Sequence, residues 1–237
     1  MTGQDIRIAA SDGGEFDSYL TLPTGAPGPA VIIMSSVFGV DDDVRADLDK
    51  LAAQGFVGVG PDLFWRGDKG PKPRTEEGDR QAKARAWPRA PLIEAGIQDL
   101  SDIMDHLKAL PQCNGKFAVV GLCYGGPFAL LGPSRLGADA GISFHGSLMQ
   151  NYIDELPKVN APLCLHWGDQ DSIAPVDVIA QIQDAARGME DVDITIYPDV
   201  LHGYTAPSSE AWDDHAASSS WAAALAVLDG LRDSVDA

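Results

Sequence analysis

The feature of this sequence that most constrains its fold is the alternation of short apolar runs with longer segments typical of helices. Continuous apolar runs such as Ala30–Met34 and Ala140–Phe144 are typical of strands buried on both faces of a sheet. Strands that alternate with helices favour a mostly parallel, twisted sheet with helices on both faces. We therefore expect an α/β fold, formed by a single domain over residues 1–237 without a separate large cap. The expected strands are Asp5–Ala9, Ser18–Leu22, Ala30–Met34, Val57–Val59, Phe117–Gly121, Ala140–Phe144, Pro162–Trp167 and Asp193–Tyr197.

The expected helices have recognisable ends. The acids Asp41 to Asp43 begin one helix, which runs to about Gln54 and has Gly55 just past its end. Acidic residues at the N-terminus of a helix and a glycine after its C-terminus both stabilise helix ends. The remaining helices are expected near Thr75–Trp87, at Leu92–Leu110, after Tyr124, at Val176–Arg187 and from about Ser209 to Arg232.

Composition excludes several classes of partner. The net charge is −18 over 237 residues, and so acidic a chain is repelled by nucleic acid and by anionic membrane surfaces. The three cysteines form an odd, widely spaced set that does not suit a disulfide framework. No apolar run is long enough to span a membrane and no leader-like segment follows Met1, so we expect a cytoplasmic protein with reduced thiols.

A glycine-flanked cysteine follows the expected strand Phe117–Gly121. Residues 119–126 are V-V-G-L-C-Y-G-G, which puts Cys123 between a strand and a helix. Free cysteine is often buried only for packing, but glycines around a residue in this setting are the pattern of a nucleophile elbow. They permit a turn too tight for side chains, with Cys123 at its apex. In such a turn the N–H of Tyr124 would point at the oxyanion that forms on attack.

An acid and a histidine follow Cys123 in the order that this architecture requires. Asp171 lies in W-G-D-Q-D-S-I-A-P directly after an expected strand, and His202 lies in L-H-G-Y after the last strand. Both stand beyond the carboxyl ends of strands, where open α/β sheets bind ligands. The pattern predicts a Cys-His-Asp triad, with Asp169 as the competing acid.

Taken together, these motifs resemble those of the dienelactone hydrolase family, within the α/β-hydrolase superfamily. The resemblance lies in four segments: G-L-C-Y-G-G, G-D-Q-D-S-I-A-P, L-H-G-Y and Val37-Phe38-Gly39. It spans roughly residues 16 to 221. It implies that Cys123 is the nucleophile, His202 the base and Asp171 the acid that orients the base.

The resemblance also implies an oxyanion hole formed by the N–H groups of Val37 and Tyr124. The family's acid stands four residues before a proline, as Asp171 stands before Pro175. This spacing favours Asp171 over Asp169, and we expect Asp169 to cap the loop.

The chain departs from the family at two positions. In the family's best-known members a glutamate just before the position of Val37 holds the resting thiol; here that residue is Ser36. Those members also use an arginine four residues after the histidine to grip a substrate carboxylate, and here Ala206 stands there. We expect Ser36 to contact the substrate, and a second carboxylate-binding arginine is expected at Arg80 or Arg85.

Several further residues are candidates for the pocket wall, because they lie near strand ends or in the motif loops. We expect His145, Ile173 and Tyr204 to contact the substrate, with Trp65 and Trp87 as further wall residues. His166 falls inside an apolar strand and is expected to be a core histidine.

The expected function is hydrolysis of activated esters or enol lactones through a thioester acyl-enzyme. This chemistry needs no cofactor and no metal, and the expected partner is a small-molecule ester or lactone, acted on by a monomer or weak homodimer. Three alternatives stay open: a ligand-binding homologue with little turnover, a general carboxylesterase or thioesterase, and a redox sensor at Cys123.

Overall fold

The computed structural model describes residues 3–86 and 90–232, the side chains of residues 84–86 and 90–92 excepted. Two compact units divide the chain between Phe117 and Ala118, and each is described by itself. The expectation of one domain stays a prediction.

The strands of the first unit pair in the order β1-β2-β4-β3. They are β1 (Gln4–Ala9), β2 (Glu15–Thr21), β3 (Gly28–Met34) and β4 (Val57–Pro61). β1 and β2 form an antiparallel hairpin, and β2 also runs antiparallel to β4. β3 runs parallel to β4. All of β3 is buried, as expected for a continuous apolar run. β2 lies earlier in the sequence than predicted.

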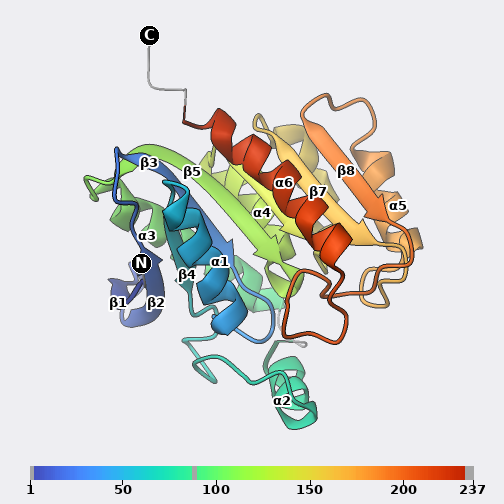
Figure 1. Ribbon diagram of the computed structural model, residues 1–237, viewed down its shortest axis with the longest axis horizontal. Coiled ribbons are helices and arrows are strands. Elements are labelled where there is room, and N and C mark those ends of the chain that lie inside the picture. The colour runs from blue at the N-terminus through green and yellow to red at the C-terminus, as the bar shows by residue number, and fades with distance from the viewer. Residues whose placement is uncertain (1–2, 87–89, 233–237) are drawn as a thin grey trace. The chain divides into compact units, whose positions relative to one another are not determined.

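Helix α1 (Asp42–Ala53) covers one face of these strands (Figure 1). It begins where the sequence predicts, because the side chain of Asp41 accepts a hydrogen bond from a first-turn N–H at 3.1 Å. The helix packs closely on β4, where Gly58 and Gly60 leave room for it. A Cβ on either glycine would lie 3.0 Å from the side chain of Leu48.

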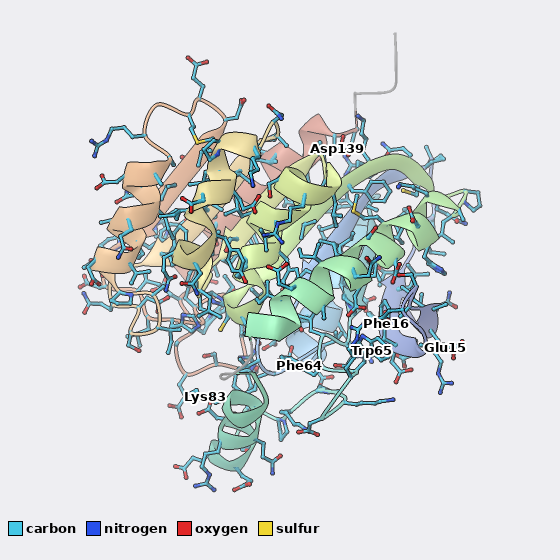
Figure 2. The ribbon with its side chains drawn as sticks, turned by 180° about the vertical axis from the view of Figure 1, so that it is seen from behind. Glu15, Phe16, Phe64, Trp65, Lys83 and Asp139 are labelled. Atoms are coloured by element: carbon cyan, nitrogen blue, oxygen red, sulfur yellow. The ribbon has the colours of Figure 1, made fainter. Side chains whose placement is uncertain are left out.

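Helix α2 (Glu76–Ala86) is followed by α3 (Ala90–Lys108), which lies over the opposite face from α1, as the reverse view in Figure 2 shows. Trp65 joins α3 to the hairpin. Its Nε1 donates a hydrogen bond to Asp99 of α3 at 2.9 Å, and its ring centroid lies 5.7 Å from that of Phe16 on β2. This candidate wall residue therefore has a packing role in the first unit.

The strands of the second unit run parallel to one another in the order β5-β6-β7-β8. They are β5 (Cys113–Leu122), β6 (Ala140–Phe144), β7 (Leu163–Gly168) and β8 (Val192–Tyr197). β5 begins a few residues before the boundary between the units. Parallel strands bring their carboxyl ends to the same edge of the sheet. The loops that follow these strands therefore gather there, and they carry the motif residues.

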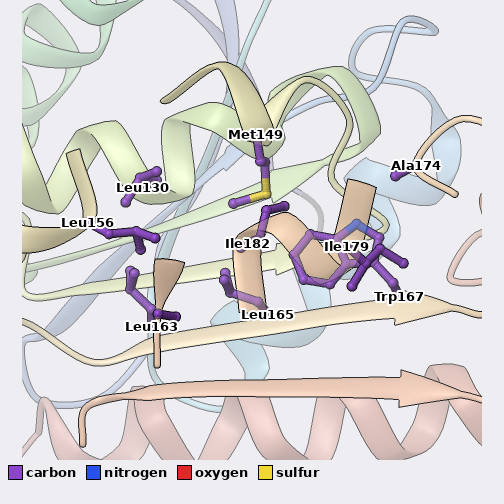
Figure 3. Close-up of a cluster of buried hydrophobic side chains, with 10 residues drawn as sticks. Leu130, Met149, Leu156, Leu163, Leu165, Trp167, Ala174, Ile179 and Ile182 are labelled. Carbon is purple, nitrogen blue, oxygen red and sulfur yellow. The ribbon is translucent and has the colours of Figure 1, made fainter. Parts of the chain in front are cut away.

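One face of this second sheet is covered by α4 (Gly126–Leu131), the 3-10 helix η3 (Met149–Lys158) and α5 (Val176–Ala185). Side chains of β7 pack with all three of them in the apolar cluster of Figure 3, where Trp167 is fully buried. Burying a large apolar side chain of this kind stabilises a fold by about 2–3 kcal/mol. η3 has no counterpart among the predicted helices.

The other face is covered by α6 (Asp214–Gly230), whose Trp221 packs edge-on against Phe144 of β6, with ring centroids 4.9 Å apart. His166 of β7 points to this side and is a core histidine, as expected. Its Nε2 lies 3.0 Å from the sulfur of Cys164, and its Nδ1 lies 3.1 Å from the hydroxyl of Tyr197. Burial lowers the pKa of His166 to about 4, so the ring is neutral near pH 7.

The start of α6 differs from the prediction. The helix begins at Asp214 rather than near Ser209, because the side chain of Asp213 caps it by accepting a hydrogen bond from the N–H of Ala216 at 2.8 Å. The N–H of Asp213 donates in turn to the carbonyl of Tyr204 at 3.2 Å. Residues 203–213 are therefore a loop that carries motif residues. None of the helices in the described parts of the chain has both the length and the apolar composition that crossing a bilayer requires.

Candidate active site

Cys123 stands at the tip of a sharp turn between β5 and α4. A single 3-10 turn spans Cys123–Gly125, and the φ angle of Cys123 is +50°, a left-handed conformation that is uncommon outside glycine. Strain of this kind persists only where the surrounding structure holds it, and it clusters at functional sites. A Cβ on Gly121 would lie 2.3 Å from the carbonyl oxygen of Gly125. The turn therefore closes only with glycine at position 121, as the elbow pattern predicts.

The surroundings of the Cys123 sulfur favour the thiolate. The residue is 7% exposed, and burial alone raises the pKa of a thiol. At Cys123 this effect is outweighed by the positive charge and hydrogen bond of His202, with smaller contributions from the N–H of Tyr124 and the hydroxyl of Ser147, so the pKa of the thiol is lowered. Because the thiolate is the nucleophilic form of cysteine, Cys123 has the chemistry of an activated nucleophile.

The other two cysteines have the opposite electrostatics. Burial raises the pKa of Cys164 to about 12, with a smaller contribution from the charge of Asp193. Burial also raises the pKa of Cys113. Neither thiol has a neighbouring group that outweighs burial, so Cys123 is the one cysteine of the three whose thiol pKa is lowered.

His202 is held by a buried carboxylate. Its Nδ1 lies 2.7 Å from Oδ2 of Asp171, whose side chain is fully buried. The other carboxylate oxygen accepts hydrogen bonds from the N–H groups of Ile173 and Ala174 at 2.8 and 2.9 Å. Burial works to lower the pKa of His202, but the nearby Cys123 and the bond to Asp171 outweigh it and raise the pKa. With Nδ1 engaged by the carboxylate, Nε2 is the ring nitrogen left for the thiol.

Asp169, the competing acid, is used for the loop itself. Its Oδ1 accepts hydrogen bonds from the N–H of Asp199 at 2.8 Å and from the side-chain amide of Gln170 at 3.0 Å. Asp199 has a φ angle of +61°, so this bond helps to hold an unfavourable backbone conformation. The structure thus places Asp171, not Asp169, against His202.

The ring of His145 lies beside the histidine of the candidate triad, and the ring of Tyr204 packs against His145. The centroid of the His145 ring lies 4.8 Å from that of His202 and 5.5 Å from that of Tyr204. His145 is 4% exposed and Tyr204 is fully buried, whereas Ile173 is half-buried. The ring of His145 packs on that of the base, and the contact of these three residues with a substrate stays a prediction.

Two residues at this site were not predicted from the sequence. The N–H of Ser147 donates a hydrogen bond to the carbonyl of Cys123 at 2.9 Å, and the Ser147 hydroxyl lowers the thiol pKa. Thr205 presents Oγ1 at 3.0 Å from Nε2 of His145. Ser147 follows strand β6 by a few residues, and Thr205 lies close to His202 in the sequence. The signal that could have indicated these two residues is their position near a strand end and near a motif.

The loop after β3 belongs to the first unit. Ser36 and Val37 are both buried there, at 6% and 4% exposure. The Ser36 hydroxyl accepts a hydrogen bond from the N–H of Phe38 at 3.2 Å, and its carbonyl accepts one from Gly39 at 3.0 Å. Ser36 therefore stabilises its own turn, and the predicted roles of Ser36 at the substrate and of Val37 in the oxyanion hole stay predictions.

Arg80 lies on α2, with its side chain 72% exposed and paired with Glu77. A guanidinium so exposed lies in solvent, and its contact with a substrate carboxylate stays a prediction. Trp87 and the side chain of Arg85 lie outside the described residues.

Comparisons with known proteins identify the family. The profile of the dienelactone hydrolase family matches residues 16–231. Carboxymethylenebutenolidase 1 of Cupriavidus pinatubonensis is 30% identical over 233 residues, which cover 98% of this chain and 99% of that protein. The carboxymethylenebutenolidase of Pseudomonas putida is 28% identical over 218 residues and 92% of each chain.

Among solved structures, a dienelactone hydrolase-like promiscuous phosphotriesterase from metagenomic libraries aligns with a TM-score of 0.79. The alignment covers 98% of this chain and 100% of that one, at 20% identity, and it shows a shared fold. The family profile matches almost the whole chain, and a curated relative matches it end to end. The chain therefore belongs to the dienelactone hydrolase family, has the α/β-hydrolase fold, and is a carboxylic ester hydrolase.

Proposed function

We propose that this enzyme cleaves activated esters or enol lactones with Cys123 as nucleophile, His202 as base and Asp171 as the acid that orients the base. The observation that carries the proposal is a strained, buried cysteine whose thiol pKa is lowered chiefly by His202, while His202 is itself held 2.7 Å from the buried Asp171. A nucleophile, a base and an orienting group in hydrogen-bond succession are the signature of covalent acyl transfer.

In the acylation step, the sulfur of Cys123 forms a bond to the substrate carbonyl carbon, and the bond from that carbon to the leaving oxygen breaks. The thiol proton moves to His202 and from there to the departing alkoxide or enolate. The imidazolium formed in between is stabilised by the carboxylate of Asp171. In deacylation, His202 takes a proton from water, the water oxygen displaces the sulfur, and the proton returns to Cys123.

The negative charge that develops on the substrate oxygen needs hydrogen-bond donors. The N–H of Tyr124 follows the nucleophile directly and already donates toward the Cys123 sulfur. The family resemblance supplies the N–H of Val37 as the second donor. Each donor of this kind contributes roughly 3–4 kcal/mol to stabilising the transition state.

The nucleophile limits the substrate class. A thiolate leaves readily from its own tetrahedral adduct, so acylation proceeds only when the other leaving group departs at least as easily. Enol lactones, aryl esters and thioesters satisfy this condition, whereas alkyl esters and amides do not. The names of the curated relatives, carboxymethylenebutenolidases, fit an enol lactone.

Two positions favour an uncharged substrate over one that carries a carboxylate. Ser36 is neutral, and Ala206 offers no cation. Arg80 is exposed and already paired with Glu77. We therefore place small, uncharged, activated esters ahead of substrates that carry a carboxylate. The enzyme requires no cofactor for this chemistry, and we propose that it acts in the cytoplasm as a monomer or weak homodimer.

The test is a stopped-flow assay with p-nitrophenyl acetate on the wild type and on Cys123→Ala. The proposal predicts a burst of nitrophenolate followed by steady turnover in the wild type, and neither in the variant. Two further substrates, p-nitrophenyl valerate and mono-p-nitrophenyl glutarate, share the leaving group and the length of the acyl chain and differ in a terminal carboxylate, so the glutarate should react more slowly than the valerate. A wild type without steady turnover would favour a ligand-binding protein or a thiol sensor, and a fully active Cys123→Ala would overturn the nucleophile.

A further inference from the structure

The turn that follows β6 has an unusual backbone. His145 has a φ angle of +44° and Leu148 one of +63°, which is the left-handed region that residues other than glycine seldom adopt. Between them, a Cβ on Gly146 would lie 2.3 Å from the hydroxyl of Ser143. Such a conformation persists only when the surrounding contacts over-determine it. The contacts of this turn, residues 145–148, are with strand β7 and with the residues of the candidate triad.

Its own position is fixed by β7. The N–H of His145 donates to the carbonyl of His166 at 2.7 Å, and the indole Nε1 of Trp167 donates to the carbonyl of Gly146 at 2.9 Å. His166 and Trp167 are both fully buried. The turn is therefore anchored to the interior of the second sheet and can serve as a rigid support.

From that support, the turn reaches both halves of the candidate nucleophile–base pair. The N–H of Ser147 holds the carbonyl of Cys123 at 2.9 Å. The ring of His145 meets the ring of His202 edge-on, with centroids 4.8 Å apart and planes inclined by 69°. An edge-to-face arrangement at this distance is a favourable geometry for aromatic rings.

His145 also holds the loop that carries His202. Its Nε2 lies 3.0 Å from Oγ1 of Thr205, and both side chains are buried. A hydrogen bond between buried groups is costly to lose, because the group left behind has no water to replace its partner. Through the ring contact and this bond, His145 limits both the tilt of the His202 ring and the path of the loop.

We propose that His145 is a positioning residue, which sets the orientation of His202 toward Cys123 through its ring contact and its hydrogen bond to Thr205. The proposal rests on the proposed function, in which His202 is the base. Asp171 fixes one ring nitrogen of His202 at 2.7 Å, and the His145 ring packs edge-on against the same ring. The two contacts together limit rotation of the His202 ring about its side-chain bonds.

The groups that set the charge at His202 are Cys123 in the 3-10 turn after β5 and Asp171 in the loop after β7, with the His145 ring beside His202. Two variants separate positioning from charge. His145→Phe keeps a ring and removes both the hydrogen bond and a titratable group. Thr205→Val removes the hydrogen bond and leaves His145 intact, and Thr205→Ser restores a hydroxyl as the matched control.

The experiment measures the pH profile of Cys123 alkylation by iodoacetamide, together with kcat and KM for p-nitrophenyl acetate. We expect Thr205→Val and His145→Phe each to lower kcat about tenfold, the effect of one hydrogen bond between buried groups. KM should stay within about twofold, because a positioning role for His145, in place of the substrate contact expected from the sequence, leaves substrate binding unchanged. Both variants should move the inflection of the alkylation rate to higher pH, whereas Thr205→Ser should behave as the wild type. In the double variant of His145→Phe and Thr205→Val, kcat should fall no further than in the worse single variant.

Two results would overturn the proposal. A rise in KM at unchanged kcat would make His145 a substrate contact, and a lower melting temperature with an unchanged alkylation profile would make it a packing residue. Failure of the proposed function is separate from both. If the wild type does not turn over esters, the alkylation profiles still report whether His145 and Thr205 control the thiolate–imidazolium pair.

Discussion

The acid of the triad gives the prediction whose size follows most directly from the structure. Asp171→Asn is nearly isosteric and keeps an oxygen in place for the N–H groups of Ile173 and Ala174, which now donate to Oδ1 at 2.8 and 2.9 Å. The change removes the negative charge that lies 2.7 Å from Nδ1 of His202. It leaves an amide N–H₂ facing that nitrogen, which favours the wrong tautomer of the ring.

The magnitude can be worked from the charge alone. Two unit charges about 4 Å apart attract by about 4 kcal/mol at an effective dielectric constant near 20. At about 1.4 kcal/mol per pKa unit, this corresponds to about three units of pKa at His202. The equilibrium constant that favours the thiolate–imidazolium pair over the neutral pair should fall by up to the same factor, and kcat/KM should fall by up to about 1,000-fold. Removing the carboxylate charge lowers the pKa of His202 and raises the pKa of the Cys123 thiol.

The assay is kcat/KM for p-nitrophenyl acetate, with the melting temperature as a check on folding. Asp169→Asn is the matched control, because it changes a carboxylate in the same loop whose bonds go to Asp199 and Gln170 rather than to His202. We expect the control to stay within about threefold of the wild type, as for a site outside the reacting groups. A folded Asp171→Asn within about tenfold of the wild type would refute the reasoning, and so would a larger loss at Asp169→Asn.

The remaining predictions concern the elbow and its thiol. Iodoacetamide should label Cys123 before the other two cysteines. The rate of labelling should fall as the pH falls and the thiolate is protonated, with the inflection of the rate below the ordinary thiol pKa of about 8.5. Equal labelling of Cys164, whose pKa burial raises to about 12, would contradict this. Gly121→Ala should lower the free energy of unfolding by about 2 kcal/mol or more, since its Cβ would lie 2.3 Å from a backbone oxygen, whereas Gly25→Ala, with nothing within 4 Å, should change it little. Ser36→Glu should slow alkylation of Cys123 and move its pH profile upward, because a carboxylate beside a thiolate raises the thiol pKa; an identical profile would mean that residue 36 does not face the sulfur.

The sequence predicted those parts of the fold and site that depend on local patterns. The apolar run of β3 and the acids before α1 predicted elements whose bounds differ little from the observed ones, because burial and capping act on neighbouring residues. The G-x-C-x-G spacing predicted the turn at Cys123 for the same reason. Its strain and the close approach at Gly121 are consequences of the local chain path.

Contacts between distant segments could not be predicted in this way. Thr205 lies 60 residues from His145, and no local pattern relates a threonine in one loop to a histidine in another. Ser147 was missed because its role depends on how the turn after β6 meets the elbow. The start of α6 was placed too early because alanine and serine before Asp213 suit a helix, whereas the cap at Asp213 decides where the helix begins.

The central claim is that Cys123 forms a thioester with the acyl group of the substrate. The enzyme can be mixed with p-nitrophenyl acetate, quenched in acid within the burst, and analysed by intact mass and peptide mapping. We expect one acetyl group per chain, located on the peptide that contains Cys123, removed by neutral hydroxylamine and absent from Cys123→Ala. Turnover with no acylated cysteine at any quench time, together with full activity in Cys123→Ala, would contradict it.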